Sequence, residues 1–315
     1  MKKLLWVIAL SLTTSVVFAK EFKEKQVKII GGVKAAYGAW PFMVALLDTE
    51  TLEAIEAGDA QRPGGFIPID EANYQAQICG ASLIDTKWVL TAAHCVVDDN
   101  GNKIKENTLK ALVGTSDLMS GGKRINIKRI IVHPDYDNNE IDSDIALIEL
   151  DSEATASTVS VSGTDAATGA LATVIGWGAL HESDPIFPTE LYQVNIPVVN
   201  RSSCDAVYGS DEFTNNMFCA GYIAGEKDTC KADSGGPLMV TQGGKSVQVG
   251  ITSWGVGCAE PGFYGVYTRL SRFDGWVKGY TETSSSSSGG GSLFFLLVPL
   301  FFIRLFRFSA KHVAQ

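Results

Sequence analysis

The chain has 315 residues, of which 45% are hydrophobic and 19% are charged, and its formal net charge is -9. This length has room for one large or two ordinary domains around a substantial hydrophobic core. The acidic balance argues against a general nucleic-acid-binding protein, which is usually basic, so no nucleic acid is expected as a partner. The two ends carry nine of the 26 basic residues, which makes the middle of the chain more acidic than the average suggests.

Residues 1–19 have the three parts of a secretory signal peptide. Lys2 and Lys3 form a short basic start, an apolar stretch follows, and residues 17–19 (VFA) match the small-residue cleavage pattern. The alternative is an N-terminal membrane anchor, but the apolar run is shorter than the ~20 residues that a span needs. Export places the protein in an oxidising compartment, so its six cysteines are expected to form disulfides.

Residues 123–132, 172–175 and 247–251 are apolar, or alternately apolar and polar, which is typical of strands. Clusters of Gly, Asp and Asn separate such stretches, and a helical pattern is visible only at residues 272–280. Many short strands without helices between them predict an all-β barrel or sandwich that ends in a short helix. The small and polar residues at 151–169 are expected to link two halves.

Three residues in separate motifs have the types that nucleophilic catalysis needs: His94 in TAAHC, Asp144 in DSDIAL and Ser234 in DSGGP. A serine becomes a nucleophile at neutral pH beside a general base, and a tight loop of small residues favours backbone donors for an oxyanion. A carboxylate commonly orients the base, and the apolar stretch after Asp144 would bury it. A lone histidine is more often structural than catalytic, but the three motifs together predict a catalytic triad.

The composition of the C-terminal end is typical of a targeting signal and not of a folded domain. Residues 283–292 form a Ser/Gly linker. Residues 293–315 begin with an uninterrupted apolar run of 11 residues, followed by Arg304, Arg307 and Lys311. This order resembles the Gly-Gly-type sorting tails of exported bacterial proteins, which a membrane protease recognises and cleaves. The alternatives are an uncleaved membrane anchor, for which the run is short, and a GPI signal.

The sequence resembles the trypsin-like serine proteases of the chymotrypsin fold over about residues 29–280. It shares seven motifs with them in the same order: IIGG at 29–32, TAAHC at 91–95, DIAL at 144–147, MFCAGY at 217–222, DTCKADSGGP at 228–237, SWG at 253–255 and GVYTR at 265–269. The resemblance implies a peptidase domain at residues 29–282, made of two six-stranded antiparallel β-barrels. It also implies that Ser234 attacks the scissile carbonyl, His94 transfers the proton and Asp144 orients the imidazole.

The cysteine pairing is open on the residues alone, because six cysteines can pair in many ways. The resemblance implies the pairs Cys79–Cys95, Cys204–Cys219 and Cys230–Cys258. The first would fix the loop of His94 and the third a wall of the substrate pocket. No His/Cys spacing suggests zinc, and neither a metal nor another cofactor is expected.

The resemblance places Asp228 at the floor of the primary specificity pocket. The walls would come from Ser253, Trp254, Gly255 and Gly265. A buried carboxylate is costly unless it pairs with a cation, so the pocket is expected to select Arg or Lys on the acyl side of the cleaved bond. Thr229 is larger than the serine or alanine usual beside this aspartate, which leaves the preference between Arg and Lys open.

Activation is implied in the same way. Cleavage after Lys28 would free the amine of Ile29, which in this family folds inward and pairs with the aspartate before the catalytic serine, here Asp233. Residues 20–28 would then be a propeptide. Because the cleavage site is itself a lysine, the enzyme or a similar activating protease is expected to perform the cut.

Ala232 departs from the family, which nearly always has glycine two residues before the serine. The backbone N–H groups of Ala232 and Ser234 are the two implied oxyanion donors. Glycine tolerates backbone angles that alanine resists, so Ala232 either strains the loop or turns the peptide away. We expect an active protease with restricted substrates and weak sensitivity to bulky protein inhibitors. Lys231 adds a positive charge at the rim.

Residues 48–77 form a second departure, because the family has a much shorter loop here. The segment is strongly acidic, and in the fold it borders the leaving-group side of the cleft. Long loops of this kind are often functional. One interpretation is an acidic exosite for basic substrates, and the other is a solvated insertion without a partner.

These features predict a serine endopeptidase, secreted or attached to the surface of a bacterial cell, that acts on proteins or peptides with Arg or Lys at the cleavage site. An activating protease and a tail-processing membrane protease would be its further partners. The alternative is a catalytically weak or inactive protease-like protein that binds at the cell surface.

Overall fold

The computed structural model describes residues 31–62, 65–179, 187–210, 212–225, 227–230 and 232–285. The predicted signal peptide, the activation residues Lys28 and Ile29, Lys231 and the C-terminal tail lie outside these residues. Within the described part of the chain, no helix combines the length and apolar character needed to cross a membrane.

The first half of the chain forms a closed antiparallel barrel of six strands in the order β2-β5-β6-β9-β8-β7. Its strands are β2 (Met43–Asp48), β5 (Gln77–Asp85), β6 (Trp88–Thr91), β7 (Leu109–Val113), β8 (Lys123–Val132) and β9 (Ala146–Leu150). In β8, Ile125, Ile127 and Ile130 are buried, and the change in their spacing coincides with a bulge between Ile127 and Arg129. The bulge inserts one residue and thereby keeps the apolar face toward the core.

The second half forms a seven-stranded antiparallel sheet in the order β1-β11-β10-β13-β14-β15-β12. Its strands are β1 (Val33–Lys34), β10 (Leu171–Gly176), β11 (Tyr192–Pro197), β12 (Met217–Ala220), β13 (Pro237–Gln242), β14 (Lys245–Trp254) and β15 (Gly265–Arg269). A bridge between Val198 and Ala220 joins the end of β11 to β12, with backbone hydrogen bonds on either side. Six strands thus curve round into a second barrel, and β1 is added at the edge. The predicted two-barrel β architecture is confirmed.

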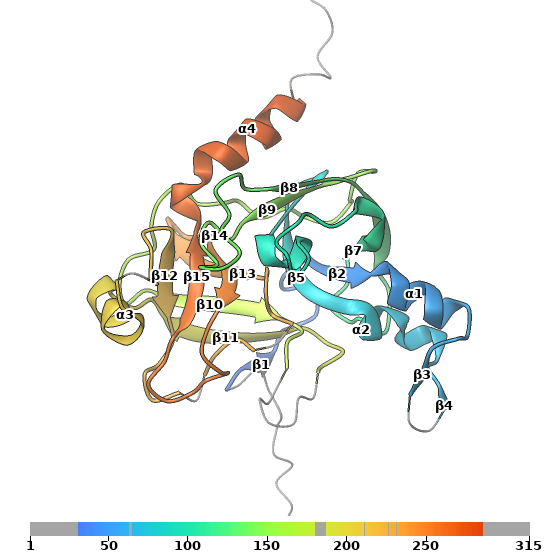
Figure 1. Cartoon of the computed structure of the whole chain (residues 1–315), viewed down its shortest axis with the longest axis horizontal. Helices are drawn as coiled ribbons and strands as arrows, with labels where there is room; N and C mark the ends of the chain where they lie inside the picture. Colours follow the sequence, from blue (N-terminus) through green and yellow to red (C-terminus); the bar gives the residue numbers. More distant parts are fainter. Residues whose placement is uncertain are drawn as a thin grey trace, which may run out of the picture.

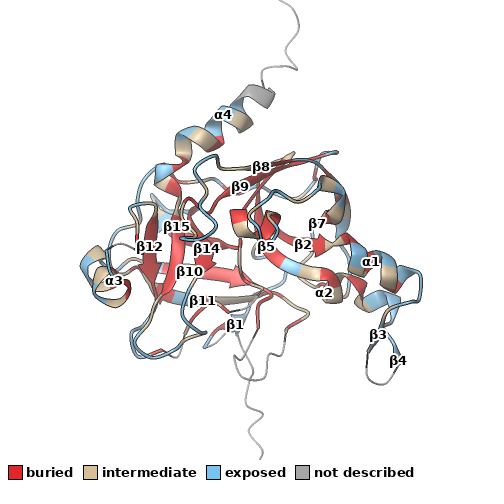
Figure 2. Cartoon of the chain, viewed as in Figure 1, coloured by how far each residue is buried: buried red, intermediate tan, exposed pale blue. Residues whose placement is uncertain are grey.

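The buried residues gather inside both barrels, where the strands are red in Figure 2. Residues 151–169 run between the barrels without a strand. The N–H groups of Ala154 and Val159 donate to carbonyls of the first barrel, and that of Ser162 donates to Gln248 in the second. The two barrels therefore form one unit with a shared boundary.

Helices are more frequent than the sequence pattern indicated. The predicted C-terminal helix is α4 (Asp274–Ser285), with Val277 buried, but α1 (Thr49–Glu56), α2 (Ala72–Ala76) and α3 (Arg201–Tyr208) were not expected. They are at most eight residues long. Side-chain caps, local packing and a disulfide stabilise them, and they have no long apolar face. Asn200 caps α3 by accepting the N–H of Ser203, and the Cys204 disulfide ties that helix to β12.

Residues 48–77, here called the insertion, fold against the first barrel (Figure 1). Asp48 caps α1 by accepting the N–H of Thr51 at 2.7 Å. The hairpin of β3 (Gln61–Arg62) and β4 (Gly65–Phe66) lies at its tip, and α1 and α2 pack together. Their apolar side chains are buried at Leu52, Ile55, Ala72 and Ala76. The described residues of the insertion are therefore a folded part of the molecule.

Candidate active site

Asp144 is hydrogen-bonded to His94, and both residues belong to the first barrel, near its boundary with the second. His94 lies in a 3-10 turn after β6, and Asp144 directly precedes Ile145 and β9. The His94 ring Nδ1 lies 2.8 Å from Asp144 Oδ2, and the His94 backbone N–H donates to Oδ1 at 2.9 Å. The Asp144 side chain is almost fully buried, and it also accepts the Ser253 hydroxyl at 2.5 Å. The carboxylate thus fixes both the backbone and the ring of His94.

This pair shifts the protonation equilibria of both groups. Burial alone would raise the pKa of Asp144, but the charge of His94 and hydrogen bonds from His94 and Ser253 hold it below its usual value. Burial would lower the pKa of His94, but the charge and hydrogen bond of Asp144 raise it above its usual value. With Nδ1–H directed at the carboxylate, Nε2 carries the free lone pair of the neutral imidazole.

Ser234 lies in a turn before β13 that needs its glycines. Gly235 has φ of +78°, and a Cβ on it would overlap Thr91 Oγ1 and the Gly80 carbonyl. The Gly80 N–H donates to the Ser234 carbonyl at 2.8 Å, so β5 of the first barrel supports a loop of the second. The DSGGP motif therefore follows from a close approach of two backbones.

The contact between β5 and the loop of Ser234 also places Ser234 near His94. A Cβ on Gly235 would lie 3.2 Å from Cys95 Sγ, and Cys95 is the residue after His94. Among the hydrogen bonds of the described residues there is none between Ser234 Oγ and His94 Nε2, and that nitrogen lies 3.7 Å from Cys95 Sγ. Such bonds are often long in ligand-free enzymes and tighten when substrate binds.

Ala232 adopts the conformation that the sequence left in question. Its φ is +71°, in the left-handed region that favours glycine. Its carbonyl accepts a hydrogen bond from Gln77 Nε2 at 3.1 Å. Alanine here takes a backbone conformation that glycine adopts freely, at the cost of strain.

Asp233 is fully buried and accepts two backbone N–H groups, from Gly178 at 2.8 Å and from Cys230 at 3.0 Å. A Cβ on Gly176 or Gly178 would overlap its carboxylate, so these glycines make room for it. Burial nevertheless raises the pKa of Asp233 to about 7. No cation of the described residues forms an ion pair with it.

A pocket of about 270 Å³ joins Ser234 to Asp228. Its lining includes the other residues that the sequence assigned to substrate binding, namely Thr229, Ser253, Trp254, Gly255 and Gly265. Asp228 is 8% exposed and accepts the N–H groups of Thr229 and Ala259, while burial raises its pKa to about 6. A Cβ on Gly265 would lie 2.8 Å from the Asp228 carboxylate, whereas one on Gly255 would meet ordinary contacts.

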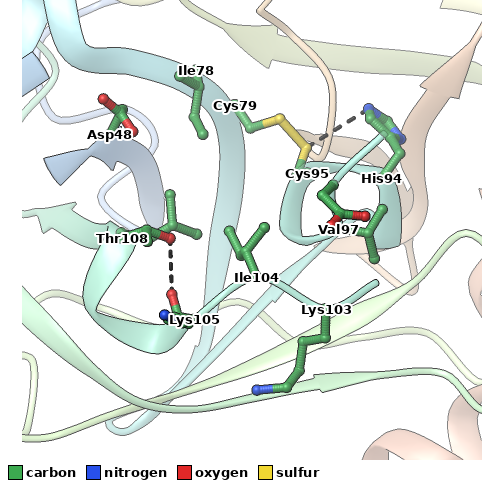
Figure 3. A pocket seen from close by; sticks show the side chains of 12 residues that line it. Asp48, Ile78, Cys79, His94, Cys95, Val97, Lys103, Ile104, Lys105 and Thr108 are labelled. Atoms are coloured by element: carbon green, nitrogen blue, oxygen red, sulfur yellow. Dashed lines mark hydrogen bonds between the residues drawn. A yellow bond between two sulfur atoms is a disulfide. The ribbon is translucent and has the colours of Figure 1, made fainter. Parts of the chain in front are cut away.

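A second cavity, of about 720 Å³, is lined by His94 and by Asp48, the first residue of the insertion (Figure 3). The Cys79–Cys95 disulfide and His94 are at one end, with Ile104 and Lys103 among the lining residues. Cys79, His94 and Cys95 also form a cluster with the spacing of metal ligands. The sulfurs are joined to each other, so they are not thiolate ligands.

The three disulfides are Cys79–Cys95, Cys204–Cys219 and Cys230–Cys258, as the resemblance implied. Sequence reasoning missed two contacts. Ser253 was assigned to the pocket wall, but its hydroxyl points to Asp144. Gln77 was not singled out, although it stands two residues before Cys79, and no motif marks it.

A sequence model of the trypsin family matches residues 29–277. The chain belongs to the trypsin family. It is 38% identical over 263 residues to Trypsin Blo t 3 of Blomia tropicalis, covering 80% of this chain and 85% of that protein. It is 40% identical over 211 residues to a trypsin of Phaedon cochleariae (65% and 79%) and 33% identical over 259 residues to Trypsin I-P1 of Gallus gallus (81% and 90%).

Membership of the trypsin family makes the chain a trypsin-like serine endopeptidase, a hydrolase that acts on proteins or peptides. The three relatives named here are animal proteins, and they lend no support to the bacterial origin expected from the tail.

Proposed function

We propose that this trypsin-family enzyme cleaves peptide bonds after Arg or Lys and is made as a zymogen. The observation that carries the specificity is the buried Asp228 carboxylate in the same pocket as Ser234. A guanidinium or ammonium group entering the pocket would pair with this carboxylate and offset its desolvation. An uncharged side chain would leave the carboxylate buried without a cation.

The proposed chemistry follows from the His94–Asp144 geometry. His94 Nε2 takes the hydroxyl proton of Ser234 as the Ser234 oxygen attacks the scissile carbonyl. Asp144 stabilises the imidazolium that forms. The N–H groups of Ala232 and Ser234 bind the oxyanion of the tetrahedral intermediate. His94 then gives its proton to the leaving amine as the C–N bond breaks. In the second half of the reaction His94 takes a proton from water as the water oxygen attacks the acyl carbonyl, and returns it to the Ser234 oxygen as the ester bond breaks and the carboxylic acid leaves.

Cleavage after Lys28 is the proposed activating step. The new amine of Ile29 would reach the buried Asp233, whose raised pKa reflects a carboxylate without a cationic partner among the described residues. The pair would fix the loop that carries Ala232 and Ser234. Because the bond follows a lysine, we propose self-activation, which would be refuted if purified Ser234→Ala zymogen still matured with no other protease present.

We further propose that residues 1–19 direct export and that residues 293–315 serve as a sorting tail or membrane anchor beyond the Ser/Gly linker. The tail would then hold the enzyme at the cell surface until a membrane protease releases or transfers it. Mass spectrometry of the mature protein from the producing cells would locate both ends.

The function is tested by hydrolysis of short Arg, Lys and Leu anilide substrates by the activated full chain. Hydrolysis of the Arg and Lys substrates is expected, with loss in Ser234→Ala and Asp228→Asn. Asp165→Asn is the matched control, because Asp165 pairs with Arg269 at the surface. Preference for the Leu substrate would contradict the specificity. A folded wild-type protein that cleaves none of them would favour the protease-like surface-binding protein.

A further inference from the structure

The Gln77 side chain of the insertion contacts residues 232–234, here called the oxyanion loop because they carry the two proposed oxyanion donors. Gln77, which ends the insertion and begins β5, donates from Nε2 to the Ala232 carbonyl at 3.1 Å. The two residues are 155 positions apart and belong to opposite barrels. Further along the same strand, the Gly80 backbone meets the Ser234 carbonyl as well. The start of β5 therefore positions this loop through two hydrogen bonds.

A bulge aims the Gln77 side chain at this loop. In the β2–β5 ladder, Leu46 opposes Cys79 but Leu47 opposes Gln77, so Ile78 is the extra residue. Ile78 is exposed, whereas the Gln77 side chain is partly buried. Bulges next to active sites re-aim side chains in this way.

The part of the insertion that precedes Gln77 is tied to the rest of the molecule by side-chain contacts. Arg124 in β8 donates to the Asn73 side chain at 2.6 Å and pairs with Glu56, which ties α2 and α1 to the barrel. The Tyr74 hydroxyl donates to the Phe187 carbonyl at 3.0 Å. The side-chain amide of Gln77 thus extends from a segment that is anchored to the barrel.

The peptide that follows Ala232 is held at both of its polar atoms. Its carbonyl accepts from Gln77, and its N–H, that of Asp233, donates to the Cys230 carbonyl at 3.1 Å. With this peptide plane fixed, the φ and ψ angles of Ala232 together set the direction of the preceding N–H, the proposed oxyanion donor, so the anchored plane limits the ways in which that N–H can turn. Alanine favours negative φ, and a return to negative φ would swing that N–H away from the reacting carbonyl.

We propose that Gln77 is a positioning residue that holds Ala232 in its left-handed conformation and so keeps the oxyanion donor aimed. It couples the insertion to the oxyanion loop and compensates for the alanine at a position where glycine would need less support. The catalytic part of this inference rests on the proposed function, whereas the conformational part does not.

The test combines Gln77→Leu with Ala232→Gly, separately and together. Leucine has nearly the same shape but no donor. Gln77→Leu is expected to lower kcat on an arginine anilide by about tenfold, less than the loss of a whole donor, with KM and benzamidine inhibition unchanged. In the Ala232→Gly background the same change is expected to lower kcat by less than about twofold, because glycine adopts positive φ without support.

Gln75→Leu is the matched control. Gln75 lies in the same insertion, and its amide donates to the Glu71 side chain, so kcat should stay unchanged. Equal losses of kcat on Gln77→Leu in the parent and in the Ala232→Gly background would overturn the proposal, as would a loss in Gln75→Leu as large as that in Gln77→Leu.

A measurement independent of activity separates this proposal from the proposed function. In Ser234→Ala protein, amide hydrogen exchange at residues 232–236 is expected to speed up on Gln77→Leu, and to stay unchanged on Gln75→Leu. Unchanged exchange in Gln77→Leu would overturn the proposal even if the wild-type protein cleaved Arg substrates. Faster exchange in a protein that cleaves nothing would support the coupling and contradict the function.

Discussion

Asp144 meets His94 with both carboxylate oxygens, one at the ring Nδ1 at 2.8 Å and one at the backbone N–H at 2.9 Å. The ring therefore cannot turn without losing one bond, and the turn that carries it cannot shift without losing the other. A third donor, the Ser253 hydroxyl, comes from the second barrel. The arrangement joins the two barrels at the point where the proposed chemistry occurs.

The first prediction concerns the acid limb of the pH profile. His94 acts as a base only when neutral, and Asp144 raises its pKa above the usual value, so kcat/KM should fall as the pH drops through that raised pKa. Asp144→Asn removes the charge that opposes desolvation, so the limb should move to lower pH. The corresponding change in a related serine protease lowers kcat about 10⁴-fold. An unmoved limb in the Asn variant would contradict the role of Asp144.

The second prediction concerns the pocket. Asp228 has its pKa raised to about 6 by burial, and an amidinium ligand pairs only with its ionised form. Benzamidine affinity should therefore fall by about tenfold for each pH unit below that value, and binding near it should release a proton. Isothermal titration in buffers of different ionisation enthalpy measures both effects. Affinity independent of pH between about 4.5 and 7 would show that the ligand does not bind the carboxylate.

The third prediction concerns the stability of the uncleaved chain. Burial raises the pKa of Asp233 from 3.8 to about 7, so the folded state binds more protons than the unfolded state between these values. The free energy of unfolding should fall as the pH rises through this window, by up to about 4 kcal/mol from this group. Urea unfolding of Ser234→Ala zymogen measures it.

Asp233→Asn is expected to remove this dependence, and cleavage after Lys28 should weaken it because the new ammonium group would pair with the carboxylate. Asp165→Asn serves as the surface control and should keep it. Parallel pH curves for the parent and Asp233→Asn would contradict a buried, unpaired Asp233.

The fourth prediction separates the steric effect of a Cβ at Gly235, next to Ser234, from the effect of its positive φ angle. Gly235 and Gly169 have φ of +78° and +79°, but a Cβ would overlap neighbours only at Gly235. Gly235→Ala should therefore destabilise the protein by about 2–3 kcal/mol more than Gly169→Ala. Equal changes in the free energy of unfolding would show that the backbone approach to Gly80 is looser than described.

The fifth prediction concerns the methyl group of Ala232. We expect Ala232→Gly to increase the affinity for a bulky protein inhibitor by about tenfold and to leave benzamidine binding unchanged, because only the larger ligand reaches the oxyanion loop. Inhibition constants for both ligands check it. No change in kcat or in inhibitor affinity would count against restriction by Ala232.

The alternation and turn pattern of the sequence was sufficient to predict the β architecture, whereas the cysteine pairs followed from the family resemblance, because six cysteines can pair in many ways. Ser234 was predicted from its own motif and Asp228 from the family resemblance, and the structure brings both to one pocket. The short helices α1 to α3 were missed because caps and packing, rather than a long apolar period, stabilise them. Gln77 was missed because its partner is 155 positions away and its aim depends on a bulge.

The most direct measurement is labelling of the activated full chain with a peptidyl aryl phosphonate that carries a guanidinium side chain, followed by peptide mapping. A serine that attacks the phosphorus, with the guanidinium in the Asp228 pocket, should give a single adduct on Ser234. The adduct should be absent in Asp228→Asn and retained in Asp165→Asn. A folded protein without an adduct, or with one elsewhere than Ser234, would contradict the account.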